Sequence, residues 1–221
     1  MKERPIIFSG PMVRALLDGR KSQTRRLIRG LEDVPADMSV YIDSNGWLSG
    51  LRPKAFDGWK FVTDIYGRKV RCPHGATGDR LWIRETWRQV FPEANGPLEY
   101  RADYGEDAQI TGGWNSPLFM PRWTSRITLE ITGLRVQRLQ DISEEDARAE
   151  GLKITGPTVN SAGEVIDDRP GYLGYGSLWH DPRRAFETLW DAVNGKRAPW
   201  SSNPWVWVLD FKRVEQEAKA A

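Results

Sequence analysis

Residues 205–211, near the end of the chain, form a segment that is apolar on both of its faces. Successive side chains of a β-strand point to opposite sides, and both sides are apolar here: Trp205, Trp207, Leu209 and Phe211 on one, Val206 and Val208 on the other. A strand with two apolar faces is covered on both of them. The segment therefore predicts an internal strand of a sheet with a core on each side.

Other segments predict that this sheet belongs to a mixed fold. Residues 126–139 alternate apolar and polar side chains, and Gly133 permits a bend or bulge there. Residues 80–87 and 24–28 carry shorter strand patterns. Helices are expected after Ser9, Ser143 and Asp181, ending at Gly19, Gly151 and Gly195. Strands outnumber helices without regular alternation, which predicts the α+β class: a curved, mostly antiparallel sheet or small β-barrel with peripheral helices.

The length of 221 residues predicts one elaborated domain over residues 1–221. Long stretches rich in Gly, Pro and polar residues interrupt it near 30–75, 88–122 and 152–180, and we expect these to be insertions. Short strand-like pieces lie inside them, at 40–48, 59–66 and 98–104.

The composition indicates a soluble globular protein located in the cytoplasm. It has 39% hydrophobic and 28% charged residues and no apolar run near the length of a membrane helix, so no membrane partner is expected. The N-terminus lacks the pattern of a secretory signal. The single cysteine, Cys72, excludes an internal disulfide and fits a reducing compartment.

Positive charge is concentrated at the N-terminus. Residues 1–29 hold eight Lys or Arg against two Asp or Glu, a net of +6, whereas the whole chain nets +2. A one-sided basic patch is the usual footprint of an anionic partner such as nucleic acid. The alternative is a solvated helix end whose arginines suit the helix dipole.

Three spaced motifs resemble the ASCH domain, a branch of the PUA-like β-barrels. They are Gly19-x-Lys21-x-x-Thr24-x-Arg26 after the first helix, Gly78-Asp79 before a strand, and Glu150 closing the helix that follows Asp141-Ile142-Ser143. Longer phrases resemble the larger ASCH-like proteins of tailed phages and prophages: residues 9–14, 78–87 and 203–208. These motifs follow the family order along nearly the whole chain.

The resemblance implies a PUA-like barrel whose cleft, between the barrel and the first helix, accepts RNA or a modified nucleoside. Small bacterial members remove the acetyl group of N4-acetylcytidine with a lysine, a threonine and a glutamate that match Lys21, Thr24 and Glu150 here. Other members are thought to bind or cut RNA. The three insertions distinguish this chain from the small members, so their activity does not transfer automatically.

The chemistry of these residues suits amide hydrolysis. Thr24 supplies a hydroxyl nucleophile, Lys21 is a base if burial lowers its pKa, and Glu150 orients Lys21 or shuttles the proton. Arg26 has a fork of donors for a carbonyl or phosphate oxygen. The alternative is that Lys21 and Glu150 form an ordinary surface ion pair and that Thr24 is an ordinary strand residue.

Further residues are candidates for ligand contact. Arg20 and Arg25 extend the basic motif, and Glu85 is either a strand-end charge or a buried functional acid. Among the eleven tryptophans, Trp114 and Trp123 lie in Gly- and Pro-rich sequence and are expected on the surface, where they can stack on bases. Four others lie in periodic elements and are expected to pack: Trp82, Trp190, Trp205 and Trp207.

Three functions follow, in order of preference. The first is binding of RNA, DNA or a modified nucleoside; the second is amidohydrolysis of an acylated cytidine; the third is a phage accessory or assembly protein that binds another protein of unknown identity. No cofactor is expected. No metal is expected either, because Cys72 and His74 are joined by only one further histidine, His180.

Overall fold

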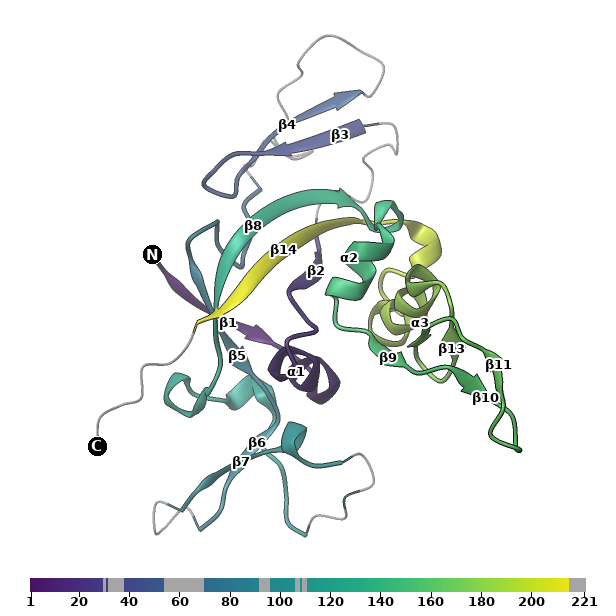
Figure 1. Ribbon diagram of the computed structural model, residues 1–221. Helices are drawn as coiled ribbons and strands as arrows, with labels where there is room; N and C mark the ends of the chain where they lie inside the picture. Colours follow the sequence, from purple (N-terminus) through teal and green to yellow (C-terminus); the bar gives the residue numbers. More distant parts are fainter. Residues whose placement is uncertain are drawn as a thin grey trace.

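The computed structural model describes residues 1–29, 31, 38–53, 70–91, 96–105, 108 and 111–214. Over these residues the chain has a mixed α+β fold (Figure 1). One five-stranded sheet forms its centre, in the order β1-β5-β8-β14-β2, and small two- and three-stranded sheets surround it. The predicted class is therefore confirmed.

The central sheet is mostly antiparallel. Only β1 and β5 run parallel, whereas β8 pairs antiparallel with both β5 and β14, and β14 with β2. The segment predicted to be an internal strand lies between two neighbours, as expected. The strands are β1 (Glu3–Ile7), β2 (Gln23–Leu27), β5 (Arg80–Arg84), β8 (Thr128–Arg138) and β14 (Trp205–Val214).

A bulge bends the two longest strands where the sequence predicted it. Asp210 of β14 lies opposite Gly133 and Phe211 opposite Ile131, so Thr132 is the extra residue of β8. A Cβ at Gly133 would come within 2.7 Å of an Asp210 carboxylate oxygen, which explains the glycine. Both strands curve strongly across the molecule (Figure 1).

The described residues do not show a closed barrel. β1 and β2 are the two ends of the strand order, and no backbone pairing between them is present in this part of the chain. A side chain connects them instead, because an Nη2 of Arg26 in β2 donates to the carbonyl of Ile7 in β1 at 2.8 Å.

Two apolar cores lie on the two faces of β14. Trp207 and Leu209 belong to one core, which includes residues of α1 (Gly10–Leu17). Val206 and Val208 belong to the other, which α2 (Glu144–Ala149) and α3 (Pro182–Asn194) cover. The four tryptophans expected to pack are all buried: Trp82, Trp190, Trp205 and Trp207.

The helices begin where their capping residues predicted. The Ser143 side chain accepts the Asp146 N–H, and the Asp181 side chain accepts the Arg183 N–H. α1 carries its proline in the first turn. No helix in the described ranges is both long and apolar enough to cross a bilayer.

The expected insertions contain small hairpins and short 3-10 helices. The predicted strand at 98–104 ends at Tyr100, because Arg101–Asp103 forms a 3-10 turn, and the one at 59–66 lies outside the described residues. The hairpin strands are β3 (Met38–Ile42), β4 (Leu48–Pro53), β6 (Trp87–Gln89), β7 (Leu98–Tyr100), β9 (Lys153–Thr155), β10 (Thr158–Val159), β11 (Val165–Asp167), β12 (Gly171–Leu173) and β13 (Leu178–Trp179). The other 3-10 helices are Pro117–Phe119, Arg122–Thr124, Leu139–Asp141 and Trp200–Ser202.

Candidate functional site

Lys21 and Glu150 form a buried ion pair. Lys21 follows α1, Glu150 caps the end of α2, and the two residues form an isolated β-bridge. The Nζ lies 2.8 Å from a Glu150 carboxylate oxygen, and the side chains are 0% and 6% exposed. The interpretation of this pair as an ordinary surface ion pair is therefore wrong.

The surroundings of Lys21 determine its proton affinity. Burial lowers the pKa of the Lys21 ammonium, and the Glu150 carboxylate opposes this shift. The Nζ donates to the carbonyls of Gln23 and Glu150 as well as to the Glu150 carboxylate, each at 2.8 Å. An ammonium has three N–H groups, so all three are occupied and none is left for a substrate.

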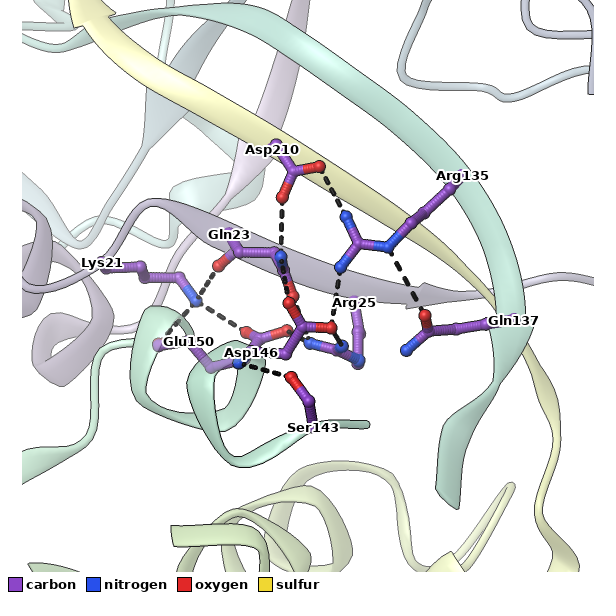
Figure 2. Close-up of polar contacts among 9 residues, drawn as sticks. All are labelled: Lys21, Gln23, Arg25, Arg135, Gln137, Ser143, Asp146, Glu150 and Asp210. Carbon is purple, nitrogen blue, oxygen red and sulfur yellow. Dashed lines mark hydrogen bonds and ion pairs between the residues drawn. The ribbon is translucent and has the colours of Figure 1, made fainter. Parts of the chain in front are cut away.

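Arg25 of β2 joins the same network (Figure 2). Its guanidinium donates to Glu150 at 3.0 Å and to Asp146 at 2.8 Å. Arg135 of β8 contacts Asp146 at 2.7 Å and Asp210 of β14 at 2.6 Å. Three cations thus face three carboxylates, and together they attach α2 to three strands of the sheet.

The sequence interpretation missed most of this network. Gln23 completes it, because its amide donates to Asp146 and Asp210 at 3.0 and 2.6 Å. Two features of the sequence could have indicated the network: the polar residues at alternate positions of β2 and the acidic residues in the first turn of α2. Their pairing requires the fold, since β2 and α2 lie more than a hundred residues apart in the chain.

Thr24 and Arg26 lie on the opposite face of β2. Thr24 is 1% exposed and lies opposite Leu209 of β14. Within the described residues no hydrogen bond joins its hydroxyl to Lys21 or Glu150. The guanidinium of Arg26 and the Nζ of Lys21 both lie 5.5 Å from the Phe8 ring centroid. The structure therefore brings Lys21 and Glu150 into contact, without a hydrogen bond to Thr24.

A cavity of about 740 Å³ lies along β2, next to the beginning of β14 and the segment that follows α3. Cavities of this size bind small molecules and nucleotides. No carboxylate belongs to the described residues that line it, but six arginines do: Arg25, Arg26, Arg29, Arg71, Arg138 and Arg197. We call this cavity the arginine pocket.

Aromatic rings contact Arg71 and Arg138, two of these arginines. Arg138 stacks 4.4 Å from the Trp205 ring centroid and donates to the Asn203 carbonyl at 3.1 Å. Arg71 stacks on Trp47 at 5.3 Å. The arginine pocket is thus strongly cationic.

His74 lines the arginine pocket as a neutral side chain. Burial, together with the neighbouring Arg26 and Arg4, lowers the pKa of its imidazole to about 4. The nearby Cys72 thiol is also buried, which raises its pKa to about 11. It is therefore protonated at neutral pH and a poor nucleophile.

Two further candidates, Arg20 and Glu85, are held within the protein. Arg20 donates to the Gly151 carbonyl at 2.7 Å and pairs with Asp18 at 2.7 Å. Glu85 is 1% exposed and accepts two hydrogen bonds from Arg126, at 2.9 and 3.0 Å. Glu85 is therefore a buried acid rather than an exposed strand-end charge.

The two tryptophans expected on the surface differ from each other. Trp123 is 67% exposed. Trp114 is only partly exposed, because it packs edge-on against Tyr104 and lies under Arg88. Arg20, Glu85 and both tryptophans lie away from the arginine pocket, which contains Arg25 and Arg26 among the candidate residues.

Three members of the arginine pocket were missed by the sequence interpretation. Arg71, Arg138 and Arg197 come from three distant parts of the chain, so that only the fold shows that they line one pocket. The described residues contain no group of three His, Cys, Asp or Glu side chains placed to hold a metal ion. Comparisons of this chain with protein-family models, curated proteins and solved structures find no match.

Proposed function

We propose that this protein binds RNA at the arginine pocket, as a nucleic-acid or modified-nucleoside binding protein of the ASCH type. The observation that carries the proposal is a pocket lined by six arginines, with no carboxylate among its described lining residues. Guanidinium groups match phosphate geometry in a bidentate manner, and phosphate contacts supply most of the affinity for a nucleic acid. A cleft next to α1, expected from the family resemblance, stays a prediction.

The proposal includes the finer assignment of the fold. We propose that the curved five-stranded sheet is that of a PUA-like domain over residues 1–221, with Arg26 bridging the two ends of its strand order. In support, Lys21 and Glu150, which the resemblance matches to two catalytic residues of the family, are in contact here. RNA as the ligand implies a cytoplasmic protein.

The test is binding of a fluorescein-labelled single-stranded RNA followed by anisotropy over a series of KCl concentrations. The logarithm of affinity should fall linearly with the logarithm of salt concentration, with a slope of about −0.7 per phosphate contacted. Arg29 and Arg197 are both exposed. The Arg29→Ala/Arg197→Ala variant should bind more weakly and make the slope shallower by about 1.4, twice the value for one phosphate.

Arg213→Ala is the matched control. Arg213 is also exposed, but it lies at the far end of β14 from Trp205, which lines the pocket. Its removal changes the net charge without touching the pocket, so the salt slope should stay as in the wild type. Equal slopes for the pocket variant and the wild type would contradict the proposal. A DNA strand of the same sequence shows whether the 2′-hydroxyl contributes.

A second candidate, hydrolysis of N4-acetylcytidine, is favoured by one observation. Lys21 lies 2.8 Å from Glu150 in a buried environment that lowers the pKa of its ammonium, as a lysine base requires. The measurement is incubation with N4-acetylcytidine, followed by chromatography and mass determination of the products. Wild type and Arg213→Ala should release acetate, and Lys21→Met should not. Absence of turnover by the wild type would reject this candidate.

A further inference from the structure

We infer that the free edge of β2 recognises a nucleobase inside the arginine pocket. In this arrangement the N–H of Leu27 and the carbonyl of Arg25 hydrogen-bond to the Watson–Crick edge of the base, while the surrounding arginines hold its phosphates. The inference rests on the proposed RNA binding. It adds that the backbone of β2 contacts the base, whereas the proposed function concerns the phosphates.

The register of β2 against β14 determines where these peptide groups point. Ile28 donates its N–H to the Trp205 carbonyl at 3.0 Å, and the Ser22 carbonyl accepts the N–H of Phe211 at 2.9 Å. In an antiparallel pair, hydrogen-bonded and non-hydrogen-bonded positions alternate. The even-numbered residues of β2 therefore bond to β14. Arg25 and Leu27, at the odd positions between, direct their N–H and C=O groups away from it.

Those outward groups meet no protein partner in the described part of the chain. β2 is the last strand of the sheet order, so no described strand pairs with its other edge. The outward carbonyl of Gln23 accepts the Lys21 ammonium, whereas the described residues provide no hydrogen bond to the outward peptide groups of Arg25 and Leu27. Both residues line the arginine pocket. An unpaired strand edge is a template for hydrogen bonding with a ligand.

The chemistry of the pocket favours a base on this edge. A guanidinium only donates hydrogen bonds, so the arginine side chains that open into the pocket satisfy phosphate oxygens but no amino group. The guanidinium of Arg25 is not among them, because it is buried and donates to Glu150 and Asp146. Every nucleobase places a donor beside an acceptor on its Watson–Crick edge, and proteins recognise single-stranded RNA there. The outward row of β2 alternates N–H and C=O groups and so provides both partners within one strand.

The first experiment compares two oligomers of equal length and charge. One is a fluorescein-labelled oligocytidine RNA, and the other is an abasic ribose phosphate chain that carries the same phosphates. The wild type should bind the oligocytidine at least tenfold more tightly. Hexaglutamate, an acidic peptide that could also pair with a strand edge, should displace the RNA no better than the abasic chain does. Displacement by hexaglutamate at concentrations as low as those of oligocytidine would overturn the inference.

The Leu27→Pro variant removes the single N–H that the inference requires. Proline is tolerated where a strand edge directs its N–H away from the sheet. One lost hydrogen bond should weaken oligocytidine binding about three- to tenfold and leave abasic binding unchanged. Leu27→Val, which keeps the N–H, is the matched control and should bind as the wild type does.

A second measurement does not depend on the proline variant folding. In protein labelled with ¹⁵N-leucine, the Leu27 amide resonance should move downfield when oligocytidine is added and stay in place with the abasic chain. An unmoved resonance, or equal affinity for the two oligomers, overturns the inference and leaves the proposed phosphate binding intact. If neither oligomer binds, the proposed function itself is rejected together with the inference.

Discussion

At the scale of single residues, we expect the buried ion pair of Lys21 and Glu150 to stabilise the contact of α2 with the segment that follows α1. Breaking a buried pair by removing one partner leaves an uncompensated charge, which costs about 3–5 kcal/mol. Lys21→Met should therefore lower the free energy of unfolding by that amount, because among the described residues Glu150 keeps an ion pair with Arg25 alone. Urea unfolding followed by circular dichroism measures the change.

The double variant Lys21→Met/Glu150→Gln tests whether the loss of stability in Lys21→Met comes from the unpaired charge that it leaves buried. Once the carboxylate is also neutralised, no net charge is left behind, so the double variant should be more stable than Lys21→Met alone. Arg184, which is exposed, pairs with the partly buried Glu187 on α3, and Arg184→Met should cost less than about 1 kcal/mol. A similarly small loss in Lys21→Met would contradict the role given to the buried pair.

At the scale of elements, Gly151 permits the close approach of the end of α2 to α1 and to Lys21, which lies between α1 and β2. Its φ is +94°, and a Cβ there would lie 2.8 Å from the Cβ atoms of Ala15 and Lys21. Gly151→Ala should therefore suffer both backbone strain and overpacking, a combined loss of about 2–5 kcal/mol in the free energy of unfolding.

Gly19→Ala isolates the backbone part of this effect. Gly19 also has a positive φ, +73°, but nothing lies within 4 Å of its Cβ position. Only the left-handed conformation is penalised, so the loss should be about 1–2 kcal/mol. Chemical unfolding of both variants gives the comparison, and equal losses would show that the contacts at Gly151 relax without cost.

The elements that sequence predicts well are those determined by local chemistry. Ser143 caps α2 through the Asp146 N–H, and β14 is internal because both of its faces are apolar. The strand expected over 98–104 is shorter, because the Arg101 N–H bonds to the Thr86 carbonyl and the chain turns there. Sequence alone does not contain such tertiary contacts.

The residues of the candidate site likewise divide into those that the sequence predicted and those that only the fold brings together. The contact of Lys21 with Glu150 was expected from a family resemblance, not from spacing, since α1 and α2 are far apart in the chain. The arginine pocket was predicted only in its β2 portion, which includes Arg25 and Arg26. Arg71, Arg138 and Arg197 come from the segment before β5, the end of β8 and the turn after α3, and only the fold brings these distant parts of the chain together.

At the scale of the whole molecule, β14 makes the two cores interdependent. Its alternate side chains belong to the core shared with α1 and to the core covered by α2 and α3. Neither core can lose β14 without exposing apolar surface in the other. The network of Figure 2 adds a polar connection, because it attaches α2 to β2, β8 and β14. We therefore expect the described sheet and helices to unfold together.

Because the described elements are expected to unfold together, protonation of one buried side chain should change the free energy of unfolding of the whole protein. His74 has a pKa of about 4 in the folded protein, against an ordinary value of 6.5, because it is buried beside Arg26 and Arg4. Above pH 6.5 the imidazole is neutral in both states and contributes no pH dependence. Between pH 6.5 and about 4 the unfolded chain binds a proton that the folded protein does not, so the free energy of unfolding falls with decreasing pH.

The expected loss across this range is at most about 3 kcal/mol, from about 1.4 kcal/mol for each unit of pKa difference. Urea unfolding of the wild type and of His74→Gln at pH 7 and pH 4.5 measures it. The difference in stability between the two proteins should change in favour of His74→Gln at the lower pH, because glutamine cannot take up the proton. Carboxylates titrate in both proteins and cancel in this comparison. A difference that stays constant between the two pH values would show that His74 is protonated as readily in the folded protein as in the unfolded chain, and that the arginines around it do not exclude a further positive charge from the pocket.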